Sequence, residues 1–168
     1  LGPRELTDVL ENYDLGMLTD IRAYERGSRR SPKAKVRTIG GNYLLKRRAP
    51  GRDGSDRISF QHSVQVHLKS NGCPVAGLVP SSSGETWRLR GSRVYELFHF
   101  IEGNRFESRL EQVESAGTAM ARMHDGCSDW EGPVHGGVSF HASEDVKTAV
   151  DHLVEHADAD MIEVTRPL

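Results

Sequence analysis

The sequence predicts an α+β fold in which an antiparallel sheet of about five strands with one inserted helix is followed by helices. Residues 18–46 contain short runs of alternating apolar and polar residues separated by glycine turn signals, which is typical of antiparallel strands. From residue 107 onward, apolar residues recur with a period of 3.6, which is typical of helices. The 168 residues, 36% hydrophobic and 27% charged, suffice for one globular domain and are too few for two ordinary ones.

The first elements are a short helix and three strands. Leu6, Val9 and Leu10 have helical spacing, which predicts a helix over residues 5–13. Alternating patterns then predict strands over residues 18–26, 35–39 and 43–46. Glycines at 40 and 41 followed by an asparagine are a hairpin turn signal between the second and third of these strands.

A helix and the remaining strands follow. Phe60, Val64 and Leu68 mark one face of a helix that ends at Asn71 and Gly72, a good C-cap pair. Strand character resumes at residues 78–79, 86–89 and 93–101, which completes a sheet of about five strands. A stripe of small and apolar residues predicts a long helix over residues 107–124, and a second stripe predicts a last helix over residues 144–156.

Composition limits the class of protein. The 22 Lys and Arg residues against 24 Asp and Glu exclude a uniformly basic nucleic-acid binder and an acidic tail protein. The sequence has no apolar run of about 18 residues and no signal peptide at its start, so we expect no membrane partner. The two cysteines, Cys73 and Cys127, make no disulfide framework, and we expect a cytoplasmic location.

The charges are strongly segregated along the chain. Residues 22–57 contain 12 Lys and Arg and 3 Asp and Glu, whereas residues 102–168 contain 5 and 14. A basic front half of this kind attracts the phosphates of a nucleotide or of nucleic acid. Two solvated surfaces that keep the protein soluble are an equally good interpretation of the charges alone.

Four segments, in order over residues 9–125, carry a resemblance to a known family. They are NYLLKRR (Asn42–Arg48), HLKSNGCPVAGLVPSSSGET (His67–Thr86), YELFHFIEGNRF (Tyr95–Phe106) and ESAGTAMARMH (Glu114–His124). In these segments the sequence resembles the N-terminal part of the aminoglycoside phosphotransferase and choline kinase-like family. The resemblance implies a protein-kinase-like, nucleotide-binding small lobe with an N-terminal helix over residues 1–102. It also implies a hinge and the first helices of the large lobe over residues 103–168.

The resemblance further implies which residues bind ATP. Lys46 corresponds to the lysine that positions the α- and β-phosphates. Gly27 and Ser28 lie where the nucleotide loop turns. Phe98 corresponds to the back of the adenine pocket, and the hinge, whose backbone reads the adenine edge, corresponds to His99, Phe100 and Ile101.

The sequence departs from the family at two places. The segment 57–71 contains no acidic residue to pair with Lys46, so the residues that could orient its amine are Gln61, His62 and Gln65. Residues 135–142 have a passing likeness to the family's catalytic loop, but Gly137 stands where that loop requires an Asp and no Asn follows, so we interpret them as the connecting loop before the helix over residues 144–156. We therefore assign no catalytic residue and no metal ligand, and expect the catalytic loop and the Mg²⁺ ligands beyond Leu168. The chain is then the ATP-binding part of a kinase that phosphorylates a hydroxyl of a small polar substrate, and by itself binds nucleotide without transferring phosphate.

Other interpretations remain open. A non-catalytic pseudokinase or remnant could act as a binding module, but aromatic residues in segment 22–57 are too few to support stacking on nucleic-acid bases. His152, Glu155 and His156 match a zinc-binding pattern, and His124 with Cys127 form a second metal candidate, although a solvated helix face and a packed helix end explain them better. If the large lobe is missing, we expect exposed apolar faces on helices 107–124 and 144–156, or a homo-oligomer that covers them.

Overall fold

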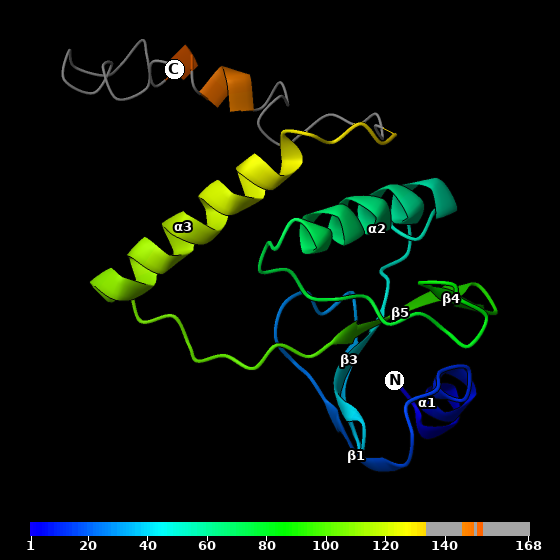
Figure 1. Cartoon of the computed structure of the whole chain (residues 1–168). Helices are drawn as coiled ribbons and strands as arrows, with labels where there is room; N and C mark the ends of the chain where they lie inside the picture. The colour runs from blue at the N-terminus through cyan, green and yellow to red at the C-terminus, as the bar shows by residue number, and fades with distance from the viewer. Residues whose placement is uncertain (134–145, 150, 153–168) are drawn as a thin grey trace. The chain divides into compact units, whose positions relative to one another are not determined.

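The computed structural model describes residues 1–133, 146–149 and 151–152, and residues 1–133 belong to one compact unit (Figure 1). Its helices are α1 (Pro3–Leu10), α2 (Ser55–Ser70) and α3 (Leu110–Cys127). Its strands are β1 (Leu18–Ala23), β2 (Lys33–Thr38), β3 (Gly41–Arg47), β4 (Arg88–Arg90) and β5 (Arg93–His99). The strands form one five-stranded sheet in the order β1-β2-β3-β5-β4, and every pair is antiparallel. The predicted α+β class and the five-stranded antiparallel sheet are confirmed.

The element boundaries differ from the prediction for local reasons. Helix α1 begins earlier than predicted, because Pro3 is well placed in a first helical turn and the Glu5 carboxylate accepts a hydrogen bond of 3.1 Å from the Gly2 N–H. Helix α2 ends as predicted, with Asn71 as its C-cap and Gly72 at a φ of 73°. The predicted strand at residues 78–79 is reduced to one bridge between Leu78 and Phe98.

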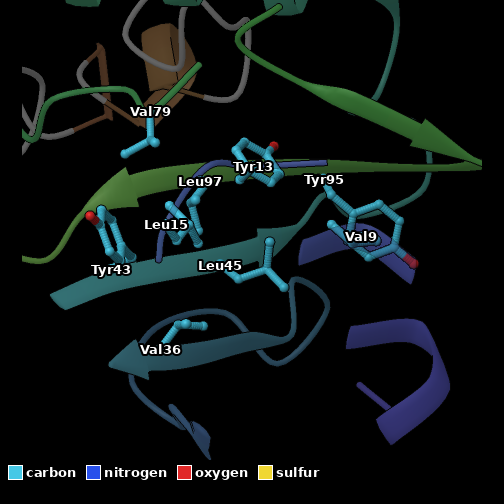
Figure 2. Close-up of a cluster of buried hydrophobic side chains, with 9 residues drawn as sticks. All are labelled: Val9, Tyr13, Leu15, Val36, Tyr43, Leu45, Val79, Tyr95 and Leu97. Atoms are coloured by element: carbon cyan, nitrogen blue, oxygen red, sulfur yellow. The ribbon is translucent and has the colours of Figure 1, made fainter. Parts of the chain in front are cut away.

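One face of the sheet carries the apolar core (Figure 2). Because successive strand residues point to opposite faces, Leu45 of β3 and Leu97 of β5, which pair in register, both enter this core and are completely buried. The core is completed by α1, by the segment after it and by neighbouring strand residues: Val9, Tyr13, Leu15, Val36, Tyr43, Val79 and Tyr95.

On β3 and β5, charged residues alternate with the residues that enter the core. Lys46 alternates with Leu45 and Arg47 on β3, Arg48 follows directly after that strand, and Glu96 alternates with Tyr95 and Leu97 on β5. These charged residues therefore occupy the opposite face of the sheet, on the side where residues of α2 reach them. This polar face also carries the apolar side chains of Leu44 and Phe98, which pair in register next to Lys46 and Glu96.

Helix α3 packs against α2 through its C-terminal end. The Asn71 side chain donates a hydrogen bond of 3.2 Å to the Gly126 carbonyl, and the Cys73 thiol donates one of 3.2 Å to the Arg122 carbonyl. Large apolar side chains elsewhere on α3 are exposed, as expected for this helix: Leu110, Val113, Met120 and Met123.

Most of the predicted last helix, 144–156, lies outside the described residues. The part of this segment that is described, residues 146–149 and 151–152, is helical. None of the helices in the described part of the chain combines the length and the apolar character that crossing a membrane requires.

Candidate functional site

Lys46 and Glu96 form the centre of the site. They lie opposite each other in the register of β3 and β5, and Lys46 Nζ is 3.2 Å from Glu96 Oε2. The Glu96 side chain is completely buried, whereas 31% of the Lys46 side chain is exposed. The carboxylate thus anchors an ammonium group that remains accessible to a ligand.

Two further side chains hold the other oxygen of Glu96. Oε1 accepts hydrogen bonds from Arg48 Nε at 2.7 Å and Arg48 Nη2, and His62 Nε2 lies 2.6 Å from it. His62 Nδ1 is in turn 2.7 Å from the Thr86 hydroxyl. Burial alone would raise the pKa of Glu96, but the hydrogen bonds from His62 and Arg48 and the positive charges of Lys46 and Arg48 lower it to about 2. Glu96 is therefore an anion that supplies a fixed negative charge beneath Lys46.

The three helix residues considered as partners of Lys46 make other contacts. Gln61 accepts a hydrogen bond of 2.8 Å from Arg48 Nη1, and Gln65 donates one of 2.6 Å to the Ala76 carbonyl. His62 reaches Glu96, as described above. The acidic partner of Lys46 is on β5, and the sequence analysis missed it, although a glutamate in the middle of the apolar run Val94–Phe98 is a signal that could have found it.

A cavity of about 300 Å³ lies on the polar face of the sheet near Lys46, whose Nζ is 5.9 Å from the centre of the Phe98 ring in the cavity wall. Leu44 and Phe98 face each other in register on β3 and β5 and form part of its wall. The other lining residues come from the segments around these strands and from α2: Tyr24, Gln65, Ala76, His99, Phe100 and Ile101. The cavity therefore brings together the four residues that the resemblance placed around adenine, from Phe98 to Ile101.

Two of the three backbone N–H groups in residues 99–101 already donate hydrogen bonds within the protein. The His99 N–H donates to the Gly77 carbonyl at 2.8 Å, and the Phe100 N–H donates to the Asn42 carbonyl at 2.9 Å. The Ile101 N–H has no such acceptor within the described residues. Of the three amides predicted to meet the adenine edge, that of Ile101 is the one available to a ligand.

Gly27 and Ser28 lie elsewhere. Gly27 has a φ of 82° and turns the loop between β1 and β2. The loop is closed by Lys33 Nζ, which donates hydrogen bonds to the carbonyls of Arg26, Ser28 and Ser31. Ser28 lines a separate cavity of about 570 Å³, which also contains Leu1 and Leu6. The structure therefore does not bring Ser28 into the cavity beside Phe98.

The metal candidates gain no support within the described residues, where no three His, Cys, Asp or Glu side chains gather in a way that could hold a metal ion. Cys127 is exposed at the end of α3. Glu155 and His156 of the zinc-like pattern, and Gly137, lie outside the described residues.

No known protein family model matches the sequence. The fold, however, is similar to solved structures of small-molecule kinases. An amicoumacin kinase solved in complex with AMP-PNP, Ca²⁺ and Ami has a TM-score of 0.70 and 14% identity over 95% of this chain and 49% of its own. A microcompartment-associated aminopropanol kinase has a TM-score of 0.68 and 16% identity over 88% of this chain and 48% of its own.

An aminoglycoside phosphotransferase from Alicyclobacillus acidocaldarius has a TM-score of 0.67 and 16% identity over 99% of this chain and 49% of its own. The chain thus spans about half the length of the kinases that it matches. At 16% identity or less the likeness is one of fold, and the chain has the fold of about half of each of these kinases.

Proposed function

We propose that the chain binds ATP and forms the ATP-binding part of a small-molecule phosphotransferase. The observation that carries this proposal is the position of Lys46, whose accessible ammonium is anchored by the buried Glu96 beside a cavity walled by Leu44 and Phe98. Adenine needs a flat apolar slot with a backbone donor, and phosphates need a charge fixed on a rigid strand. Both requirements are met on one face of β3 and β5.

The adenine would lie against Leu44 and Phe98, with the Ile101 N–H as its hydrogen-bond donor. Leu44 and Lys46 are two residues apart on the same face of β3, which separates them by about 6.6 Å along the strand. The phosphates attached to a base in the cavity would therefore pass the ammonium of Lys46. Ion pairing with Glu96 keeps that ammonium in place without covering it.

The proposed parent reaction moves the γ-phosphoryl group of ATP to a hydroxyl of a small polar substrate. In this proposal residues 1–102 are the nucleotide-binding lobe, and residues 103–168 are the hinge and the first part of the substrate lobe. The catalytic aspartate and the Mg²⁺ ligands would lie outside this chain. The exposed apolar side chains of α3, such as Leu110 and Met120, would contact that substrate lobe or a second copy of the chain.

Calorimetric titration of the chain with ATP and Mg²⁺ at physiological salt tests the proposal. We expect saturable binding that weakens about tenfold or more in Lys46→Ala, because a charge-assisted contact to phosphate is lost. Lys69→Ala, which removes an exposed lysine near the end of α2, is the matched control and should leave the affinity unchanged. Equal ATP affinity of the wild-type and Lys46→Ala proteins would contradict the proposal. Binding of a duplex oligonucleotide that is weakened by salt and unaffected by ATP would favour a nucleic-acid-binding module instead.

A further inference from the structure

A second, smaller cavity of about 170 Å³ touches Lys46 where β3 ends and α2 begins. Its lining includes Ser31, Gln61 and four basic side chains: Lys46, Arg48, Arg52 and Arg57. Nothing in the resemblance to kinases assigns a role to Arg52 or Arg57. The cavity is therefore a concentration of positive charge that the proposed nucleotide site does not yet explain.

The positive charge of this cavity is only partly balanced. Lys46 and Arg48 share the carboxylate of Glu96. The exposed side chains of Arg52 and Arg57 form no ion pair with any residue in the described part of the chain.

The two acidic residues closest to these arginines in sequence have local partners. Asp53 accepts a hydrogen bond from the Gly51 N–H at 3.0 Å, and Asp56 accepts one from the Ser55 hydroxyl at 3.2 Å. Neither aspartate lines the cavity. A net positive charge is thus left facing this space, which favours an anionic ligand.

The cavity is also built on a fixed framework. The Arg48 side chain is only 8% exposed, and its Nη1 donates hydrogen bonds to the Arg52 carbonyl at 3.0 Å and to Gln61 Oε1 at 2.8 Å. Arg48 thereby ties the loop that carries Arg52 to the helix that carries Arg57. The backbone that carries the two arginines is therefore held in place, and anion binding would order only their exposed side chains.

We infer that this cavity binds a phosphate oxyanion through Arg52 and Arg57 beside Lys46. Guanidinium groups match the oxygens of a phosphate with paired, charge-assisted hydrogen bonds. Leu44 and Lys46 lie on one face of β3 and Arg48 follows directly after the strand, so the apolar cavity, the ammonium and the basic cavity come in that order along the chain. A nucleotide whose base occupies the apolar cavity would extend its terminal phosphate toward the two arginines. That identification of the phosphate as part of a nucleotide rests on the proposed function.

Three titrations of the full chain, with ATP, with inorganic pyrophosphate and with adenosine, distinguish binding in the basic cavity from binding in the rest of the nucleotide site. Calorimetry is carried out without phosphate buffer on the wild-type protein and on Arg52→Ala/Arg57→Ala. The control is Arg4→Ala/Arg93→Ala, which removes the same charge from two exposed arginines that line neither cavity. Thermal unfolding curves verify that both double variants remain folded.

We expect Arg52→Ala/Arg57→Ala to weaken the binding of ATP and pyrophosphate about tenfold or more and to leave adenosine affinity unchanged, because only phosphate contacts are lost. Wild-type affinity for ATP and pyrophosphate in this variant would overturn the inference while leaving the proposed function intact. The absence of pyrophosphate and ATP binding to the wild-type protein would overturn it as well. Pyrophosphate binding that depends on the two arginines, in a protein that binds neither ATP nor adenosine, would support the oxyanion cavity and contradict the nucleotide proposal.

Discussion

Glu96 lies directly opposite Lys46 in the pairing of β5 with β3, and the two side chains form an ion pair of 3.2 Å. The same carboxylate accepts hydrogen bonds from Arg48 and contacts His62. A completely buried carboxylate is expensive to desolvate and stable only when its partners replace the lost water. The polar face of the sheet is therefore organised around Glu96, and Lys46 is the member of the group that faces outward.

Replacing Glu96 with Gln should destabilise the fold. The substitution leaves the charge of Arg48, whose side chain is almost fully buried, without its counter-charge, and breaking a buried pair in this way costs about 3 kcal/mol. Urea denaturation followed by circular dichroism measures the loss. Glu102→Gln is the control, because Glu102 is 67% exposed in its pair with Lys35, so its loss should change stability by at most about 1 kcal/mol. Similar losses in the two variants would contradict the central role of Glu96.

Acid should destabilise the protein through the same carboxylate. The pKa of Glu96 is lowered to about 2 in the folded protein from an ordinary value of 4.5. Its contribution to stability is fully present above about pH 5 and is lost as the pH falls toward 2, because the unfolded chain takes up a proton first. Burial alone would raise the pKa of Glu5, but hydrogen bonds from Tyr95, Gly2 and Arg47 and the charge of Arg47 lower it to about 2 as well, so Glu5 adds to this trend.

Urea midpoints at pH 7, 5 and 3.5 test this expectation. The wild-type midpoint should fall steeply between pH 5 and 3.5, and that of Glu96→Gln should fall less, because this variant has lost one of the two responsible carboxylates. Parallel pH profiles for the two proteins would show that Glu96 does not carry the acid sensitivity.

The sequence predicted the strands well because their patterns are local. Alternation over a few residues and the turn signal at Gly40 and Gly41 locate β2 and β3 without knowledge of any distant residue. The partner of Lys46 was not predictable in this way, because it depends on the register between β3 and β5, which are separated by some 50 residues of chain. Because residues 57–71 contain no acid, the sequence predicted Gln61, His62 and Gln65 as the partners of Lys46 instead.

The proposed nucleotide site also depends on contacts between residues that are far apart in the sequence. Phe98 and Ile101 were assigned from the resemblance, and the structure shows that they line one cavity. Which backbone amide is available there depends on the carbonyls of Gly77 and Asn42, which come from other parts of the chain. The basic cavity likewise combines a loop, a strand and a helix, so charge counting along the sequence indicated a basic region without locating a site.

Filling the apolar cavity walled by Leu44 and Phe98 should prevent the base of a nucleotide from binding there. Leu44→Trp places a larger ring in a cavity of about 300 Å³, so adenosine affinity should fall about tenfold or more from loss of space. Leu89→Trp is the control, since Leu89 is 60% exposed on β4, away from the cavity. Calorimetry with adenosine measures the effect. Unchanged adenosine affinity in a folded Leu44→Trp protein would show that the base binds elsewhere.

Two glycines of α3 should respond in opposite ways to the same substitution. A Cβ atom at Gly126 would lie 2.7 Å from Cys73 Sγ and 3.2 Å from Leu68 Cδ2, whereas a Cβ at Gly117 meets nothing within 4 Å. Gly126→Ala should therefore destabilise the packing of α3 on α2 by about 1–3 kcal/mol. Gly117→Ala should stabilise the helix by about 0.5–1 kcal/mol, because alanine loses less backbone entropy on folding.

Urea denaturation of both variants tests this contrast, and the double variant Gly126→Ala/Cys73→Ala identifies its cause. Removing the Cys73 sulfur relieves the closer of the two contacts, so Cys73→Ala should cost less stability in the presence of Gly126→Ala than in the wild-type background. Stabilisation by Gly126→Ala equal to that by Gly117→Ala would mean that the two helices do not approach each other at this glycine. Strictly additive effects of Cys73→Ala and Gly126→Ala would show that the sulfur is not the obstructing group.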